Sequence, residues 1–178
     1  MNEDTKKMKI YTYPDPVLKL RAEEIQNIDG GIQTLIDNMI WTMYSAPGIG
    51  LAANQVGEPS RLIVFDLSPK EEGRNPGVLI NPEILLGEDQ VVWEEACLSV
   101  IDFSAEVSRK ARVKVKGFDR HGNPVDIEAE DLLAVCLQHE IDHLDGILFI
   151  DHISSLKRSM YKKRLKKRLK KMLAEKEE

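Results

Sequence analysis

Apolar residues recur at helical spacing in three segments of the chain. The first segment lies between Asp29 and Pro47, and its apolar positions are Ile32, Leu35, Ile36, Met39, Ile40 and Met43. The second, residues 130 to 145, reads EDLLAVCLQHEIDHLD, with acidic residues in its first turn and Gly146 just after its end. The third, from about 155 to 174, mixes Lys and Arg with Leu156, Met160, Leu165, Leu169, Met172 and Leu173. We therefore predict three helices, the second buried over its first half and the third basic and amphipathic.

Four shorter segments have the composition of β-strands. They are rich in branched residues and read RLIVFDL (61 to 67), VLINPEILL (78 to 86), DQVVWEE (89 to 95) and RVKVKGFD (112 to 119). The sequence DRHGNP at 119 to 124 is typical of a turn, so residues 112 to 130 are predicted to form a hairpin. Strands and helices in this order indicate an α+β protein. We expect a main domain over 1–155 and a basic helix over 156–178 that is part of the same domain or a tail.

Length and composition fit one compact domain of 178 residues. Two cysteines, Cys97 and Cys136, are too few for a disulfide framework. The polar start MNEDTKKMKIYTYPDP has no apolar stretch of a secretory signal, and no apolar run approaches the roughly 18 residues that a membrane helix needs. We therefore expect a cytoplasmic protein with no membrane partner.

The charge of the chain is divided unevenly. The formal net charge is -5, but residues 156 to 178 hold eleven Lys and Arg against three Glu, while the first 155 residues hold 14 basic and 27 acidic residues. An acidic body with a basic end predicts that the end contacts an anionic partner.

The sequence QHEIDH, residues 138 to 143, indicates a metal site. His139 and His143 are four positions apart, and positions i and i+4 lie on one face of a helix, close enough for both imidazoles to reach one ion. Glu140 can then face a water molecule at the ion. A buried helix makes such polar side chains costly unless they are paired or bind a metal.

The third ligand decides the kind of site. The metzincin protease pattern H-E-x-x-H-x-x-G-x-x-H fits through Gly146, but its last position is Phe149, which cannot bind a metal. Cys136 would have to bridge about 10 Å of helix together with His143. Cys97 comes from a separate element and is the better candidate, with a small core residue as the alternative.

Three motifs together resemble those of the peptide deformylase family. They are GIGLAANQ (48 to 55), EACLS (95 to 99) and HEIDH (139 to 143), and the likeness extends to YPDPVLK (13 to 19), LINPEI (79 to 84) and GILFIDHIS (146 to 154). The family has an α+β fold with antiparallel or mixed strands around a central motif helix. The resemblance implies a deformylase-like catalytic domain over 1–155.

The resemblance also implies an activity, the hydrolytic removal of the formyl group from the N-terminal formylmethionine of newly made proteins. It implies that Cys97, His139 and His143 hold a divalent metal, which lowers the pKa of water and so makes a nucleophile available at neutral pH. Family members typically use Fe(II), with zinc, nickel or cobalt able to replace it, so Fe(II) is expected. Proton transfer falls to Glu140.

The family's motifs assign the stabilisation of the developing oxyanion to the side-chain amide of Gln55 and the backbone N–H of Leu98. They also imply an ion pair between Arg109 and Asp142 that orients the motif helix. A methionine side chain needs an apolar pocket. The positions expected to contact the substrate are Ile49, Gly50, Trp93, Glu95, Leu132, Val135 and Cys136. Plain core packing is the alternative for the apolar members.

The chain departs from the family at Ala96, Ile101 and Ser104, where relatives usually have Gly, commonly Pro and often Arg. These departures leave open a weakened deformylase paralogue with altered substrate preference, or a silent one. A zincin-type metallopeptidase, which would need a metal ligand other than Cys97, is a further alternative. By analogy with relatives, the basic helix is expected to bind the ribosome, with packing on its own domain as the alternative. We expect formylmethionyl nascent peptides as substrate partners and no DNA.

Overall fold

The computed structural model describes residues 5–69 and 72–174. The predicted main domain (1–155) and basic helix (156–178) each extend beyond the described residues, by residues 1–4 and 175–178. The side chain of Leu173 also lies outside what is described. The prediction of an α+β protein is confirmed. In chain order the elements are η1 (Pro16–Lys19), α1 (Gly30–Ser45), β1 (Gly50–Ala52), η2 (Ala53–Val56), β2 (Leu62–Phe65), β3 (Gly77–Glu88), β4 (Val91–Cys97), β5 (Val100–Arg109), β6 (Arg112–Phe118), β7 (Pro124–Glu130), α2 (Asp131–Leu144), η4 (Phe149–Asp151) and α3 (Ser155–Ala174).

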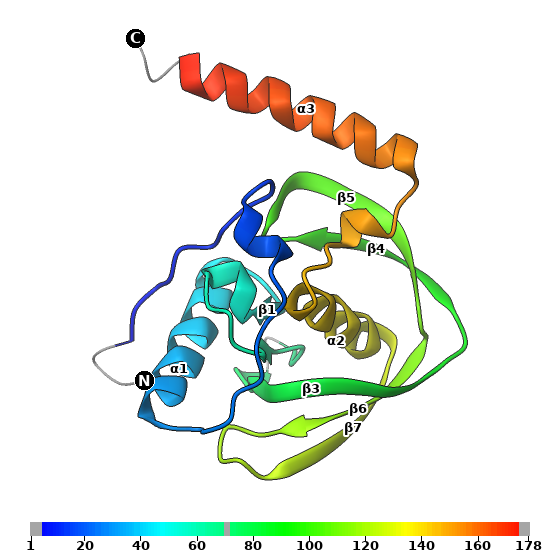
Figure 1. Ribbon diagram of the computed structural model, residues 1–178. Helices are drawn as coiled ribbons and strands as arrows, with labels where there is room; N and C mark the ends of the chain where they lie inside the picture. The colour runs from blue at the N-terminus through cyan, green and yellow to red at the C-terminus, as the bar shows by residue number, and fades with distance from the viewer. Residues whose placement is uncertain (1–4, 70–71, 175–178) are drawn as a thin grey trace.

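The strands form two sheets whose neighbouring strands all run antiparallel. One sheet has the order β1-β2-β3-β6-β7, and the other is the β4-β5 pair. The predicted hairpin at 112–130 is present as β6 and β7, with Arg112 opposite Glu130 and Phe118 opposite Pro124. Figure 1 shows that the strands surround α2, which lies at the centre of the molecule. The sequence prediction did not include β1 or β5.

Helix α2 is central because its apolar residues contact the large sheet along its whole length. Leu137 and Leu144 are fully buried in one core cluster with Leu79 of β3 and Val115 of β6. The helix ends where Gly146 adopts φ +73° and packs against the backbone of Lys19, so closely that a Cβ would lie 2.5 Å from the Lys19 carbonyl oxygen. Only glycine fits this turn without strain.

Helix α1 begins at an Asp29 cap, whose carboxylate accepts a hydrogen bond from the Ile32 backbone N–H at 3.0 Å. Its buried face, with Ile36, Met39 and Met43, packs with Leu51 of β1 in a second core cluster. This packing holds the start of β1, and therefore Gly50, at the edge of α2.

Helix α3 crosses the outside of the molecule and is fixed by one face (Figure 1). Tyr161 and Leu165, one turn apart, are buried in a third core cluster with Phe149 and residues of β5. Of the apolar residues that give this helix its spacing, Leu165 is buried, whereas Leu156, Met160, Leu169 and Met172 are exposed, because only the face with Tyr161 and Leu165 reaches the body. Within the described part of the chain, no helix has the length and apolar character to cross a membrane.

Candidate active site

Cys97, His139 and His143 are brought together although they come from different elements. Cys97 ends β4, and the two histidines lie one turn apart on α2. One ligand atom from each lies within 4.8 Å of the others, and Cys97 Sγ is 3.2 Å from His143 Nε2. Metal bonds of about 2.0–2.3 Å in a tetrahedral site place ligand atoms roughly 3–4 Å apart. One thiol and two imidazoles at this spacing therefore fit a metal ion after a small adjustment.

The ring of His139 is oriented by a buried ion pair behind it. Its Nδ1 lies 2.7 Å from Glu95 Oε2, so Nε2 is the nitrogen that remains for a metal. Arg109 donates to both oxygens of Glu95, from Nε at 2.6 Å and from Nη2 at 3.1 Å, and its Nη1 donates to Asp142 at 2.5 Å. Burial alone would raise the pKa of Glu95, but its hydrogen bonds with His139 and Arg109 lower it to about 2. Glu95 is therefore a fixed negative charge.

Glu140 is buried at the edge of the same site. Among the described residues, its Oε2 has no hydrogen-bond partner. Burial raises its pKa to about 7, an effect that the nearby His139 partly offsets. Gly50 of β1 leaves the space for this carboxylate, since a Cβ built on Gly50 would lie 2.8 Å from Glu140 Cδ. A carboxylate with this pKa and a free oxygen can take up and release a proton near neutral pH.

Gln55 lies in η2, almost fully buried, with its amide held in one orientation. Its Oε1 accepts from the Ala52 backbone N–H at 2.8 Å, and its Nε2 donates to Ser99 Oγ at 3.0 Å and to Cys97 Sγ at 3.5 Å. One N–H of this amide therefore points at the metal-ligand cluster. Leu98 follows Cys97 in the tight turn between β4 and β5.

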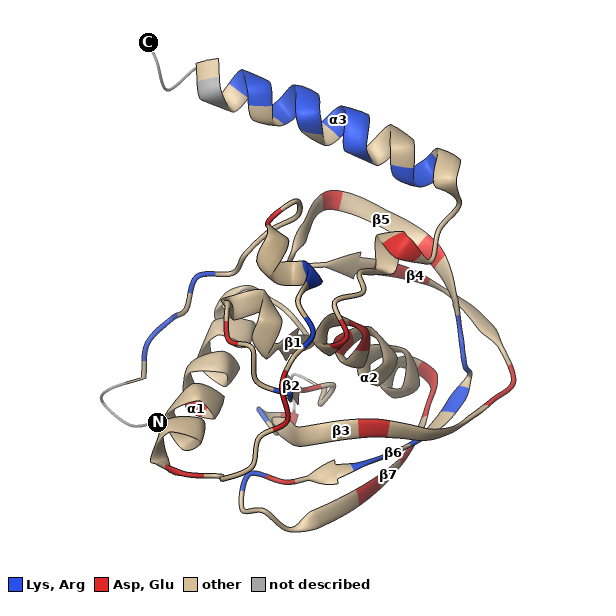
Figure 2. Cartoon of the chain, in the orientation of Figure 1, with Lys and Arg blue, Asp and Glu red and all other residues tan. Residues whose placement is uncertain are grey.

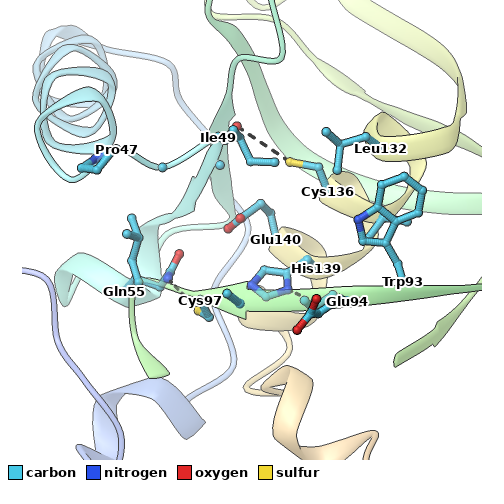
Figure 3. A pocket seen from close by; sticks show the side chains of 16 residues that line it. Pro47, Ile49, Gln55, Trp93, Glu94, Cys97, Leu132, Cys136, His139 and Glu140 are labelled. Atoms are coloured by element: carbon cyan, nitrogen blue, oxygen red, sulfur yellow. Dashed lines mark hydrogen bonds and ion pairs between the residues drawn. The ribbon is translucent and has the colours of Figure 1, made fainter. Parts of the chain in front are cut away.

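A cavity of about 400 Å³ opens onto these groups. Figure 3 shows Ile49, Leu132, Cys136 and Trp93 gathered together, on the other side of Glu140 from Gln55. Every position expected to contact the substrate lines the cavity, which is bounded by Pro47, Gly48, Ile49, Gly50, Gln55, Trp93, Glu94, Glu95, Ala96, Cys97, Leu98, Leu132, Val135, Cys136, His139 and Glu140. Its walls are largely apolar on the side away from Gln55. Both Glu95 oxygens are already bonded to Arg109 and His139, so a contact between Glu95 and a substrate stays a prediction.

The chain is similar to proteins of one family. The family model described as polypeptide deformylase matches residues 7–159. A peptide deformylase of Thermodesulfovibrio yellowstonii is 57% identical over 157 residues, 88% of this chain and 95% of that protein. This chain belongs to the polypeptide deformylase family.

Solved structures of family members have the same fold. A peptide deformylase crystal structure from Legionella pneumophila superposes with a TM-score of 0.87 at 43% identity, covering 95% of this chain and 98% of that one. The Met-Ala-Ser-bound class I type b peptide deformylase from Acinetobacter baumannii gives 0.78 at 33% identity, covering 84% and 99%. The family is metal-dependent, in agreement with the Cys/His/His cluster described above.

The three departures from the family pattern leave the cluster intact. Ala96 is not among the described non-glycine residues with positive φ, so alanine fits the position where relatives have glycine. Ser104 donates to Glu94 Oε1 at 2.8 Å, and Ile101 is exposed in the bulge that follows the turn at Cys97. Ala96 lines the cavity and Ser104 contacts the cavity residue Glu94, whereas Ile101 is not a lining residue; none of the three belongs to the ligand cluster.

Two residues in the site's surroundings were missed by the sequence analysis. Ser99 stands in the quoted EACLS motif, and its hydroxyl holds the Gln55 amide. His152 lies 2.7 Å from Asp142 and so extends the ion pairs behind His139. Ser99 could have been found, because it stands in the EACLS motif, whereas no spacing rule connects His152 to the metal ligands.

Proposed function

We propose that this chain is a peptide deformylase that removes the formyl group from the N-terminal formylmethionine of new proteins and releases formate. The observation that carries the proposal is that a Cys/His/His cluster and a buried Glu140, whose Oε2 has no hydrogen-bond partner among the described residues, lie together at the end of one largely apolar cavity. A cavity of about 400 Å³ suits a methionine side chain and its flanking backbone. The Acinetobacter baumannii relative is described as bound to Met-Ala-Ser, a peptide that begins with methionine.

Cys97, His139 and His143 would hold the metal, which we propose is Fe(II), as the family resemblance implies. A soft sulfur with two nitrogen donors is compatible with several first-row metals, including zinc, nickel and cobalt. When bound, a divalent ion supplies Lewis acidity and lowers the pKa of water at the site. The buried ion pair of Glu95 and Arg109 fixes the His139 ring, so that this ligand is already oriented before any ion binds.

The protein's own groups move the proton and stabilise the charge. The Oε2 atom of Glu140 would accept the proton of the attacking water and pass it to the leaving amine, and a pKa of about 7 suits both steps. The Gln55 N–H that faces Cys97 and the backbone N–H of Leu98 would donate to the oxygen of the formyl group as it gains charge. Ile49, Leu132, Val135, Cys136 and Trp93 would enclose the methionine side chain.

The test is formate release from formyl-Met-Ala-Ser by anaerobically prepared, Fe(II)-loaded protein. We expect wild-type turnover, a loss of at least 10²-fold in kcat for Glu140→Ala with the metal content unchanged, and no loss for Glu106→Ala, an exposed carboxylate on β5. If loaded wild-type protein releases no formate, or if Glu140→Ala is as fast as wild type, the proposal is wrong. Peptidase activity retained by Cys97→Ala would favour the zincin alternative.

We also propose that α3 belongs to the catalytic domain and offers its outer face to ribosomal RNA. Figure 2 shows Lys and Arg along α3 and no acidic residue on it. Arg168 forms an ion pair with Asp102 of β5, and Arg164 donates to the Asp102 carbonyl oxygen, so these two cations contact the body. The exposed lysines of α3 include Lys162, Lys163, Lys166, Lys167 and Lys170. Phosphate binding by such residues depends strongly on salt.

Removing α3 is a poor test of this partner, because it would also uncover the core that Tyr161 and Leu165 cover. A better variant changes Lys162, Lys163, Lys166 and Lys167 to Gln, with four other lysines, Lys7, Lys9, Lys110 and Lys114, changed in a control. We expect only the first variant to lose cosedimentation with ribosomes at low salt. If the two variants and wild type cosediment equally with ribosomes, the proposed RNA-binding role of α3 is wrong.

A further inference from the structure

A chain of hydrogen-bonded side chains runs from the metal-ligand His139 to the protein surface and ends at His152. Behind His139 come Glu95 and then Arg109, whose side chains are 3% and 5% exposed. Asp142 is next, and its Oδ2 lies 2.5 Å from Arg109 Nη1 and 2.7 Å from His152 Nε2. The His152 side chain is 35% exposed, so it is the point where this network meets the solvent.

The geometry settles the direction of the last hydrogen bond. A carboxylate can only accept, so the proton between the two groups lies on His152 Nε2 and is donated to Asp142 Oδ2. Arg109 Nη1, which is 3.4 Å from the same nitrogen, then has no acceptor there and keeps Asp142 as its partner. Two donors thus converge on Oδ2 of Asp142 and fix the carboxylate between them.

The segment that carries His152 supports His139 from a second side. Phe149 of η4, fully buried, stacks against the His139 ring with centroids 6.1 Å apart and planes at 25°. Phe149 stands where the metzincin pattern would place a third histidine. The short stretch from Phe149 to His152 therefore contacts the ligand ring directly at one end and the charges behind it at the other.

We propose that His152 is a positioning residue for the metal site, acting through Asp142, Arg109 and Glu95 on the ring of His139. Without its hydrogen bond, Asp142, whose side chain is 20% exposed, gains freedom to turn toward water. Arg109 then loses the partner that holds its Nη1 in place. The guanidinium plane, which donates two hydrogen bonds to Glu95, is therefore less well fixed. Groups behind metal ligands commonly change metal affinity by 10–100-fold when removed. The inference rests on the metal site proposed above and not on the identity of the substrate.

The experiment measures how fast the cobalt-loaded protein gives up its metal to an excess of chelator, followed by the absorption of the cobalt–thiolate bond. Three variants are compared with wild type. His152→Leu removes the donor, His152→Gln can still donate from its amide, and His121→Leu changes an exposed histidine at the β6–β7 turn. Thermal unfolding of each protein without metal reports whether the fold itself has changed.

We expect His152→Leu to release cobalt roughly three- to ten-fold faster, less than for a direct partner of a ligand, while His152→Gln and His121→Leu remain within two-fold of wild type. The ligand-field bands of cobalt should shift in His152→Leu alone. Equal release rates in all four proteins, or equal acceleration in the Leu and Gln variants at position 152, would overturn the proposal. If His152→Leu is poorly folded, His152→Asn, too short to reach Asp142, takes its place with the same expectation. Wild-type protein that holds no cobalt would overturn this role and the metal site together.

Discussion

Gly50→Ala tests whether β1 leaves room for the catalytic carboxylate. The added Cβ would lie 2.8 Å from Glu140 Cδ and 2.9 Å from Glu140 Cγ. Ordinary carbon contacts are about 3.5–4.0 Å, so Glu140 or β1 must move by roughly 0.7–1 Å. A misplacement of about 1 Å at a reacting group can cost about 10² in rate, which corresponds to about 2.7 kcal/mol in the barrier. We therefore expect kcat for formate release to fall by about 10²-fold.

The assay separates this effect from general damage. Gly30→Ala, at the start of α1, places a Cβ with no atom within 4 Å and serves as the matched control, with expected kcat near wild type. Cobalt content should be unchanged in Gly50→Ala, because Glu140 is not a ligand in the cluster.

A double-mutant cycle then locates the effect. If Gly50→Ala acts through Glu140, it should have little further effect on kcat in a Glu140→Ala background. A kcat within two-fold of wild type for Gly50→Ala, or a full 10²-fold loss on top of Glu140→Ala, would refute the reasoning.

Three further predictions concern the supports of the site. Glu95→Gln removes the more deeply buried of the two carboxylates that pair with Arg109, the other being Asp142. The free energy of unfolding, measured in urea, should fall by about 3–5 kcal/mol. Glu83→Gln, which breaks an exposed pair with Lys116, should cost at most about 1 kcal/mol. Hydrogen bonds with Lys19 and with the Leu148 backbone N–H, opposed by burial, hold the pKa of Asp151 below its ordinary 3.8. A carboxyl with a lowered pKa stabilises the fold above its ordinary pKa, and this stabilisation is lost as the pH falls through the pKa of the folded state. The difference in stability between wild type and Asp151→Asn should therefore be full at pH 7 and disappear below pH 3.8. A difference that persists in acid would contradict this. Stripping the metal with a chelator should abolish formate release and lower the melting temperature, and cobalt should restore both.

The fold was predictable where the local pattern and the final packing agree. The periodic segments gave α1, α2 and the β6–β7 hairpin within about two residues. Strand β5 was missed because Asp, Ser and Glu interrupt its apolar residues and because buried and exposed positions alternate only in its second half, where the buried ones are Ala105, Val107 and Arg109. The buried face of α3 could not be read from the sequence, because the spacing of Leu and Met does not show that Tyr161 and Leu165 are the residues that face the body.

The site was predictable as a set of residues and less so as a network. HEIDH gave the two histidines and Glu140, Cys97 was the better candidate for the third ligand, and the three-motif resemblance supported these residues and added Gln55; their roles in catalysis stay predictions. Ser99 and His152 depend on how β4, β5 and η4 meet around α2, which no periodicity encodes. Glu95 was expected at the substrate, but in the structure both its oxygens face Arg109 and His139.

The central place of α2 sets the order in which this protein can assemble. The strands that surround the helix all precede it in the chain, and the apolar face of the large sheet is covered by Leu137, Ile141 and Leu144 of α2. During synthesis, residues 1–130 therefore emerge with that face open to water and with Cys97 lacking its histidine neighbours. A nascent chain paused before α2 would expose the apolar face of an antiparallel sheet, the kind of surface that aggregates or recruits chaperones. For this fold the element that completes the metal site also covers the apolar face of the large sheet, so burial of that face and the capacity to bind metal arrive in the same step.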